Sequence, residues 1–303
     1  MEVSESTGYD YEPSRQRTTS MSPPKKVDVD PDEQIVLREW RELIEEHYAD
    51  DLKRLEGMED SVCGFYVEHA LMDKKPTLRR FFHEKTTRAL ELGNRIMREQ
   101  FDNHNLVTRP VLRVVGLSEN YLNRVDELRM RDRNDLVSLD VKINDVSQPY
   151  GWLKLAVYEC MDCEETVRMP QRRARERESP AMCRTCVGRA LELVKAEDIP
   201  WSMFNPGPFF RLLVEECKYE DVQDISMSQI TYNSEHHLIN CTTRNQIIGT
   251  VTDDLVDQLR GSEYKRINGI LRVQPVPDRT FAKDTRRLLS IDILSVEDLH
   301  IEE

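Results

Sequence analysis

The chain has 303 residues, of which 39% are hydrophobic and 33% charged, and its formal net charge is −13 at pH 7. No apolar run approaches the ~18 residues that a membrane-spanning helix needs, so we expect no membrane partner. The negative charge excludes a uniformly basic surface, because phosphate contacts need concentrated lysine and arginine. Any contact with nucleic acid must therefore be local.

Residues 1–29 are rich in serine, threonine, proline and charged residues. Such a segment cannot bury enough apolar surface to offset the entropy of ordering it, so we expect a disordered tail. The same segment lacks the apolar core of a secretory signal, which predicts a protein of the cytosol or the nucleus.

Helical periodicity dominates residues 30–115, which we interpret as a helical subdomain. Asp30 as a cap and Pro31 in the first turn favour the start of a helix, and Gly57 ends it. Between them an apolar stripe recurs at three-to-four-residue steps, as expected for packing against other helices. The stripe consists of Val36, Trp40, Leu43, Ile44, Tyr48, Leu52 and Leu55.

Two more helices are expected further along the chain. One begins at about Pro76 and keeps apolar residues at helical spacing up to Phe101. A shorter one is expected to begin with Ser118 as its cap and to place Tyr121 and Leu128 on one side.

The hydrophobic period changes from 3.6 to 2 at Leu136, which predicts half-buried strands. Alternation is clearest at Val137, Leu139, Val141 and Ile143, and it recurs at Leu153, Leu155 and Val157. Further strands are expected near residues 209–214, 225–230, 238–241, 246–251, 264–273 and 288–296. Many short strands favour a barrel or a sandwich, and a small closed barrel of the OB type leaves few exposed edges.

Two cysteine pairs interrupt the strand pattern with the C-x2-C spacing of a zinc ribbon. They are Cys160 with Cys163 and Cys183 with Cys186, and the segment between them is long enough for a short excursion that returns. Four thiolates complete a tetrahedral shell and leave no open position for water or substrate, so we predict one structural zinc ion per chain. The remaining cysteines are expected to be reduced, buried thiols: Cys63, Cys217 and Cys241.

The predicted fold is therefore α+β with several modules. An N-terminal helical bundle precedes a five-stranded OB-fold β-barrel, formed by residues 116–158 and 209–303. A four-cysteine zinc ribbon at residues 159–208 is inserted into the barrel.

Positive charge gathers in two segments. One lies between the cysteine pairs and comprises Arg168, Arg172, Arg173, Arg175 and Arg177. The other comprises Arg129, Arg131 and Arg133. Acidic residues are interleaved in both, so a phosphate contact and a solvated mixed-charge surface remain open for each.

The order of the modules and three sequence stretches resemble the N-terminal region of the minichromosome-maintenance (MCM) replicative DNA helicases, most of all the archaeal members. The stretches are Asp126–Val137 leading to Leu155–Cys160, Phe210–Leu213 continuing into Cys217–Gln223, and Gln246–Asp257 followed by Ile267–Leu271. The resemblance runs from about residue 31 to the end of the chain. Its most specific parts are the cysteine spacing and the Asp-Asp-Leu-Val-Asp stretch at Asp253–Asp257.

In that family this region forms a ring that encircles DNA, with the barrel contacting a single strand and an inward hairpin lining the channel. The resemblance implies single-stranded DNA, double-stranded DNA or both as a partner, and a homo-oligomer that is expected to be a hexameric ring, with a double ring as a further level. None of the eleven glycines is followed by lysine, so the G-x-x-x-x-G-K-[ST] phosphate loop is missing and we expect no enzyme activity of this chain itself. The full-length parent is expected to be an ATP-dependent DNA helicase, cytoplasmic at an archaeal nucleoid or nuclear in a eukaryote.

The resemblance places DNA contacts on basic residues of the barrel and its surroundings. Arg244 is the first candidate, and Lys142, Lys154 and Lys218 are weaker ones. The predicted set is completed by Arg129, Arg131, Arg133, Arg172 and Arg173. Tyr150 and Trp152 stand where the family has a basic stretch, and they could either stack on bases or pack against the barrel.

Two other functions are compatible with parts of the sequence. An RNA-binding translation factor also combines helices, small barrels and a four-cysteine ribbon, but its ribbon is normally terminal, whereas this one lies mid-chain. A zinc-dependent hydrolase needs a histidine or acidic ligand and an open coordination position, and His236 and His237 form no H-E-x-x-H motif.

Overall fold

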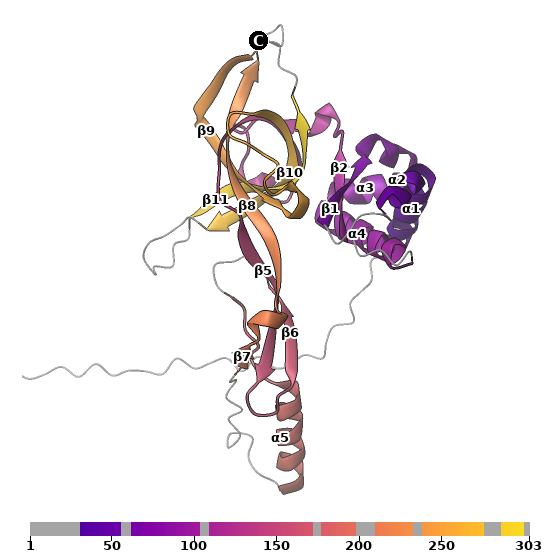
Figure 1. Cartoon of the computed structure of the whole chain (residues 1–303), viewed down its shortest axis with the longest axis vertical. Coiled ribbons are helices and arrows are strands. Elements are labelled where there is room, and N and C mark those ends of the chain that lie inside the picture. Colours follow the sequence, from indigo (N-terminus) through magenta and orange to yellow (C-terminus); the bar gives the residue numbers. More distant parts are fainter. Residues whose placement is uncertain are drawn as a thin grey trace, which may run out of the picture.

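The structure, a computed structural model, describes residues 31–55, 62–103, 109–171, 177–197, 210–232, 238–275 and 286–299. A helical subdomain lies beside a β-barrel, and an arm extends from the barrel (Figure 1). The predicted α+β fold, with a helical bundle, a five-stranded OB-type barrel and an inserted four-cysteine module, is confirmed. Within these ranges, no helix has the length and apolarity to cross a membrane.

The helical subdomain packs α1 (Pro31–His47), α2 (Ala49–Leu55), α3 (Pro76–Glu84) and α4 (Thr86–Asn103) around one apolar core. The stripe of α1 is buried as predicted, with Val36, Trp40, Leu43 and Ile44 fully enclosed. The indole N–H of Trp40 donates to the carbonyl of Ala89 at 3.0 Å, so burial leaves no unsatisfied donor on this side chain.

Both long predicted helices are divided in the structure. The first is divided at Tyr48, between α1 and α2, where the tyrosine hydroxyl accepts a hydrogen bond from the backbone N–H of Glu68 at 2.8 Å. The second is divided at Lys85, between α3 and α4, whose φ of −137° and ψ of 51° are not helical. Thr86 then donates its hydroxyl to the carbonyl of Phe82 at 2.7 Å, which fixes the corner.

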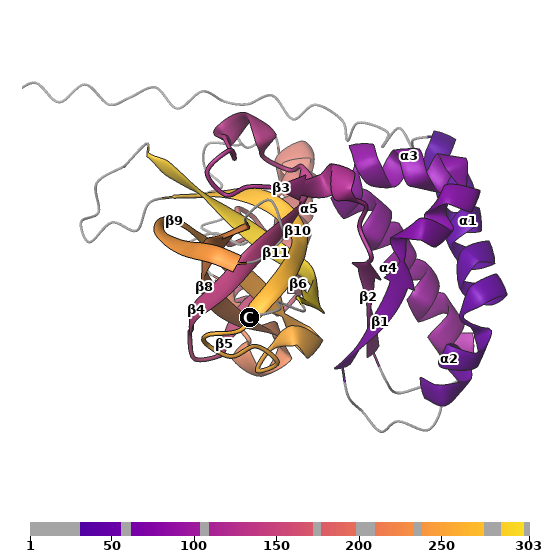
Figure 2. The same ribbon diagram turned by 90° about the horizontal axis from the view of Figure 1, so that it is seen from above.

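Two strands of the helical subdomain were not predicted. β1 (Val62–Glu68) and β2 (Arg109–Val115) form a parallel pair, and the 3-10 helix η1 (His69–Lys74) follows β1. Phe65, Val67, Leu112 and Val114 of this pair belong to the helical core. Figure 2 shows the pair on the side of the helical subdomain that faces the barrel. Because α3 and α4 lie between the two strands in the chain, local periodicity did not reveal the pair.

The predicted third helix is wrong. After Ser118 the chain forms the short 3-10 helix η2 (Glu119–Tyr121) and the two-residue strand β3 (Leu122–Asn123). The apolar residues of the expected stripe serve two different cores, because Tyr121 packs on the helical core and Leu128 lies in the barrel core. Tertiary packing therefore overrides the local helical pattern here.

The barrel consists of β4 (Leu136–Val146), β10 (Tyr264–Pro275), β11 (Arg287–Asp298), β9 (Leu238–Thr252) and β8 (Lys218–Tyr232), in that spatial order. Pairing of β4 with β8 closes it. Closure leaves no free edge on these five strands and encloses the predicted alternating residues of β4, Val137, Leu139, Val141 and Ile143.

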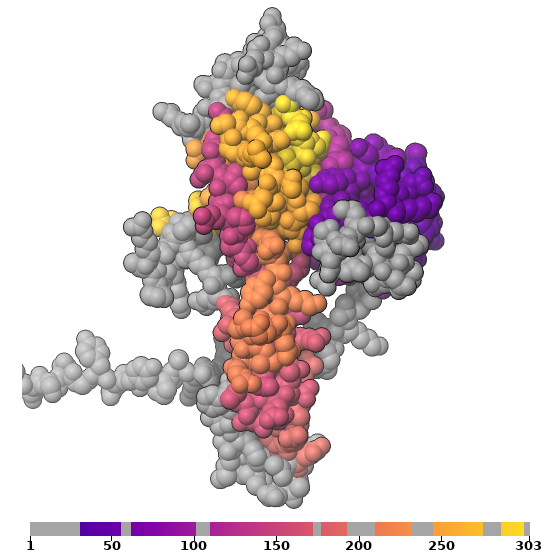
Figure 3. Space-filling model, in the orientation of Figure 1, coloured from indigo at the N-terminus to yellow at the C-terminus, as the bar shows by residue number. Residues whose placement is uncertain are grey.

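The arm is built on strands that are continuous with the barrel. β5 (Tyr150–Cys160) pairs with the first residues of β8 and runs outward, where β6 (Thr166–Pro170) and β7 (Phe210–Leu212) pair with its far half. Helix α5 (Arg184–Glu197) and the 3-10 helix η5 (Val214–Glu216) complete it. Figure 3 shows the arm as a narrow projection from the wider body.

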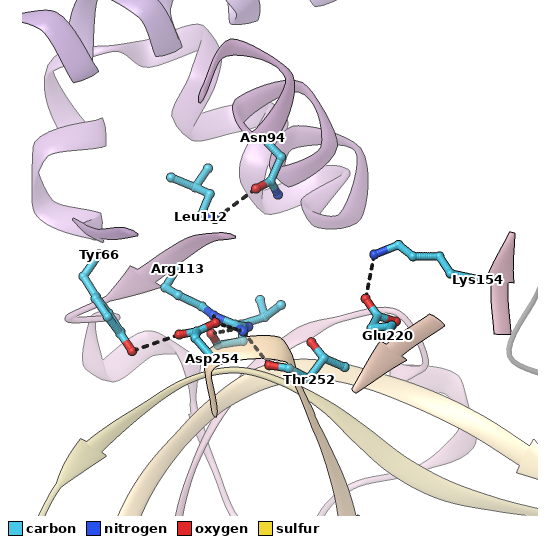
Figure 4. A network of polar contacts seen from close by, with 9 residues as sticks. Tyr66, Asn94, Leu112, Arg113, Lys154, Glu220, Thr252 and Asp254 are labelled. Carbon is cyan, nitrogen blue, oxygen red and sulfur yellow. Dashed lines mark hydrogen bonds and ion pairs between the residues drawn. The ribbon is translucent and has the colours of Figure 1, made fainter. Parts of the chain in front are cut away.

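Arg113 of β2 holds the helical subdomain to the barrel (Figure 4). Its guanidinium donates to Oδ1 of Asp254 at 2.5 and 3.1 Å, to the carbonyl of Thr252 at 2.8 Å and to the carbonyl of Leu294 at 3.2 Å. The side chains of Arg113 and Asp254 are only 3% and 9% exposed. Tyr66 of β1 donates its hydroxyl to Oδ2 of Asp254 at 3.4 Å, so both strands of the pair contact this carboxylate.

The Asp253–Asp257 stretch is a structural joint. Its first three residues form the 3-10 helix η6 (Asp253–Leu255). The last residue of the stretch, Asp257, is hydrogen-bonded to Gln223 of β8. The backbone N–H of Asp257 donates to Oε1 of Gln223 at 3.0 Å, and Nε2 of Gln223 donates to the carbonyl of Ser147 at 2.8 Å. The stretch thus links the helical subdomain, the barrel and the β4–β5 turn.

We predict that Arg113→Met lowers the free energy of unfolding by about 3–5 kcal/mol, because it leaves the Asp254 carboxylate buried without its cation. Denaturant unfolding followed by tryptophan fluorescence measures this. The control Lys53→Met removes an exposed pair with Asp50 and should change stability by no more than about 0.5 kcal/mol. Equal stability of the Arg113 variant and the parent would contradict the role of the pair.

Candidate metal centre and predicted DNA-contact residues

The four predicted cysteine ligands come together at the arm. Cys160 ends β5 and Cys163 lies in the turn that follows, while Cys183 immediately precedes α5 and Cys186 lies in its first turn. The sulfur of Cys160 is 3.7 Å from that of Cys186, and the sulfur of Cys163 is 3.5 Å from that of Cys183. All four sulfurs lie within 4.8 Å of one another.

Local hydrogen bonds fold each cysteine pair into a tight turn. In the first turn the N–H of Cys160 donates to the carbonyl of Glu165 and the N–H of Glu164 to the carbonyl of Cys160, both at 2.9 Å. In the second, the N–H of Val187 donates to the carbonyl of Cys183 at 3.0 Å and starts α5. The arm strands place these two turns face to face.

The donor set fits a metal ion with tetrahedral preference. Metal–sulfur bonds of about 2.3 Å in a tetrahedral site place neighbouring sulfurs about 3.8 Å apart, close to the two separations above. Four protein ligands leave no position for substrate, so the arrangement can support the fold of the arm and cannot perform metal catalysis. The cluster could therefore hold one structural ion per chain.

The four thiols shift one another's pKa values through hydrogen bonds and burial. Burial by itself would raise the pKa of the Cys183 thiol, but hydrogen bonds from the backbone N–H of Cys186 and from neighbouring thiols outweigh it and lower the pKa to about 7. The pKa of Cys186 is raised, first by its hydrogen bond with Cys163 and then by burial. The lowered pKa favours the thiolate form of Cys183, which is the form that binds metal ions.

Tyr158 supports the cluster from within the arm. This residue is 2% exposed, and its hydroxyl donates to the carbonyl of Glu178 at 2.7 Å, which ties β5 to the segment that leads to Cys183. The guanidinium of Arg177 lies 5.8 Å from the centre of its ring. The sequence offered one signal for this role, an aromatic residue two positions before the first ligand.

The three lysine candidates differ in their surroundings. Lys142 of β4 lies with its ammonium 5.6 Å from the centre of the Tyr264 ring. Lys154 of β5 forms an ion pair with Glu220 at 2.7 Å, so its charge is already balanced. Lys218, the first residue of β8, is exposed.

Arg129, Arg131 and Arg133 lie on one exposed turn around the 3-10 helix η3 (Met130–Asp132). Arg129 donates to the carbonyls of Asp126 and Leu128 at 2.7 and 2.8 Å and so caps the turn. Arg131 forms an ion pair with Asp132 at 3.4 Å, although its side chain is 84% exposed. The mixed-charge surface predicted for this segment is present, and a role in DNA contact stays a prediction.

Arg244 lies where the pairing of β8 with β9 is irregular. Ser228 faces Gln246, whereas the next residue of β8, Gln229, faces Thr242. Thr243, Arg244 and Asn245 therefore have no register partner on β8 and bulge from the ladder. The described residues exclude the side chain of Arg244 and exclude Arg172 and Arg173 entirely, so these three predictions lie outside them.

The aromatic pair at the β4–β5 turn is in contact with the barrel. The rings of Tyr150 and Trp152 are 6.2 Å apart, and the hydroxyl of Tyr150 donates to Oδ2 of Asp224 at 3.0 Å. Tyr150 is still 37% exposed. The packing interpretation therefore applies to Tyr150 in part, and base stacking stays a prediction.

Sequence reasoning missed Arg113 and Tyr66, the residues that join the subdomains. One signal could have revealed the first: Arg113 is the only charged residue between Pro110 and Val115, in an otherwise apolar run. A single charge inside a buried strand usually has a specific partner. Its partner, Asp254, is 141 residues away and could not be identified without the fold.

No protein-family model and no curated protein matches this sequence. Among solved structures, the chain is similar to the crystal structure of the N-terminal domain of an archaeal MCM, with a TM-score of 0.65 and 18% sequence identity. The match covers 88% of this chain and all of that domain. The chain therefore has the fold of an MCM N-terminal domain, as the sequence resemblance implied.

We predict that Cys183→Ser abolishes stoichiometric metal binding, because three thiolates cannot complete the tetrahedral shell. Elemental analysis of the purified chain measures the metal content. The control Cys217→Ser changes a thiol that bonds to the carbonyl of Leu213 and lies outside the cluster, so it should keep the metal. Retention of one ion per chain by the Cys183 variant would refute the ligand assignment.

Proposed function

We propose that this chain is the DNA-binding and ring-forming N-terminal region of an MCM-type replicative helicase. The observation that carries the proposal is the fold: a helical subdomain, a closed OB-type barrel and a four-cysteine arm match an archaeal MCM N-terminal domain over that domain's whole length. The function is DNA replication, with DNA gripped irrespective of sequence through the barrel and the β8–β9 hairpin.

The metal of the arm is proposed to be zinc. A shell of four thiolates on two C-x2-C turns is the usual ligand set of structural zinc, and zinc imposes no geometry beyond the tetrahedron that these sulfurs offer. Zinc would hold the two turns together and keep the end of β5 against α5.

DNA contact is proposed to centre on Arg244. Its place in a bulge of the β8–β9 hairpin frees its backbone from the ladder and suits a residue that must reach out from the barrel. Lys142, Lys154, Lys218, Arg131 and Arg133 are further candidates, of which Lys154 and Arg131 already form ion pairs at the surface. Phosphate contacts of this kind carry no sequence information and weaken with salt.

A ring resolves the conflict between the net charge of −13 and DNA binding. Copies arranged around an axis bring a few inward cations together, while the acidic outer surface remains in solvent. We propose a homo-hexamer, with a double ring as a further level of assembly. ATP-driven unwinding would belong to a module outside this sequence, in the archaeal cytoplasm or the eukaryotic nucleus.

We predict that Arg244→Ala weakens binding to a single-stranded oligonucleotide equally for different sequences. The slope of log affinity against log salt should fall in magnitude by about 0.7 for each phosphate that the variant no longer touches. Fluorescence anisotropy at several salt concentrations measures both. The control Arg38→Ala removes an exposed cation of α1 and should leave both unchanged. An unchanged slope for Arg244→Ala would move the contact to another residue.

We also predict that the chain assembles into a particle six times the 35.6 kDa chain mass. Light scattering after size-exclusion chromatography, with and without single-stranded DNA, measures the mass. The Arg244→Ala variant should assemble like the parent, because the inward hairpin is proposed to contact DNA and not a neighbour. A monomer under all these conditions would contradict the ring.

A further inference from the structure

The four thiols of the arm are arranged as two mixed pairs. Each short sulfur–sulfur separation joins one cysteine of the first turn to one of the second, Cys163 to Cys183 and Cys160 to Cys186. In each pair one thiol is buried and the other is partly exposed: Cys160 and Cys183 are 3% and 5% exposed, while Cys163 and Cys186 are more open. Solvent can therefore reach one member of each pair, and the other member of the pair lies on the opposite turn.

The cross-turn pairing of the sulfurs determines which disulfides oxidation of the cluster would form. Metal ligation holds all four sulfurs as thiolates, so exposure decides the order: a small oxidant reaches the open sulfurs first, and a buried neighbour from the other turn then resolves the oxidised sulfur. A disulfide bond is about 2.05 Å long, so the two sulfurs of each pair must approach by about 1.5 Å to form one. The products would be two disulfides that cross from one turn to the other.

We propose that the cluster is an oxidation site for peroxides, at which the bound metal is exchanged for the disulfides Cys163–Cys183 and Cys160–Cys186. The inference goes beyond the proposed function, since it requires neither DNA nor a ring. Its consequence is that the arm releases its metal and stays closed, because both disulfides link the same two turns that the metal links.

The step balances for each pair. One thiolate attacks a peroxide oxygen and breaks the O–O bond, which gives a sulfenic acid and one hydroxide. The second thiolate attacks that sulfur, forms the S–S bond and expels a second hydroxide. Two electrons pass from the sulfurs to the peroxide, so two thiolates and one hydrogen peroxide yield one disulfide and two hydroxides. Four thiolates consume two peroxides, and the metal loses all its ligands.

The other described thiols lack such a partner. Cys217 donates to the carbonyl of Leu213 and accepts from the N–H of Val157, and Cys63 lies on β1 in the helical subdomain. Neither belongs to the group of thiols within reach of one another. Oxidation by one equivalent of peroxide per pair should therefore be confined to the arm. In a reducing compartment a dithiol would reverse it, which makes the change transient.

The test treats the metal-loaded full chain with hydrogen peroxide and follows metal release with a chromogenic chelator. We expect one ion released per two peroxides, and a fall in titratable thiols from the seven of the sequence to three. The oxidised chain should melt in the same thermal transition as the loaded chain, whereas in a chain stripped by chelator under reduction the arm should melt before the barrel. A dithiol with added metal should restore the starting state.

Peptide mapping identifies the disulfides. Trypsin cleaves after Lys154, Arg168, Arg177, Arg184 and Arg189, so crossed disulfides join residues 155–168 to both 178–184 and 185–189 in one three-peptide species. Cleavage before Asp162 then separates Cys160 from Cys163 and assigns each bond. The control Cys217→Ser should give the same map and release the same metal.

Disulfides within the turns, Cys160–Cys163 and Cys183–Cys186, would overturn the proposal, as would sulfinic acids or melting of the arm before the barrel on oxidation. A chain that keeps its metal at two peroxides per ion would overturn it as well. These readouts are independent of DNA affinity and particle mass. The proposed function can therefore fail while the oxidation site stands, and the reverse also holds.

Discussion

The contact between Arg113 and Asp254 fixes how the modules of this protein sit against one another. The guanidinium is enclosed and bonded to one carboxylate and two carbonyls, all supplied by the barrel and η6. A buried ion pair is not by itself strongly stabilising, but each partner is costly to leave alone, so the pair specifies one docking position. Ser295 adds a hydrogen bond to the carbonyl of Val114, and Gly64 leaves room for the close approach of Asp254. The helical subdomain is thereby tied to the Asp253–Asp257 stretch, which also contacts β8.

The arm is positioned by strands that continue from the barrel, and not by a side-chain ion pair. β8 extends from the barrel into its pairing with β5, so the two cysteine turns stand at the end of a ladder of paired strands and not on a free loop. A loss of metal should therefore loosen the turns and α5 before it disturbs the barrel. This separation makes a metal-free, disulfide-closed arm compatible with an intact barrel, and it keeps any DNA contact of the β8–β9 hairpin independent of the state of the cysteines.

The sequence predicted best where the physical signal was local. The C-x2-C turns, the stripe of α1 and the alternation of β4 each depend on neighbouring residues, and the structure confirms them. It predicted worst where a partner is remote. β1 and β2 pair although two helices separate them in the chain, and the stripe after Ser118 is divided between two cores. The ion-pair partners of basic residues could not be predicted for the same reason. Lys154 pairs with Glu220, which is 66 residues away in the chain, and the sequence around the lysine gives no sign of this partner.

The sequence by itself determined that two C-x2-C cysteine pairs interrupt the strands of a small barrel, which follows a helical module. Ligand spacing and hydrophobic period are properties of short segments and need no fold to be read. Only the tertiary structure decided which charged side chains pair with each other within the molecule, which thiols face one another, and how the modules dock. These properties depend on distances between residues that are far apart in the sequence. Side-chain burial and pairing between such residues arise only when the chain folds.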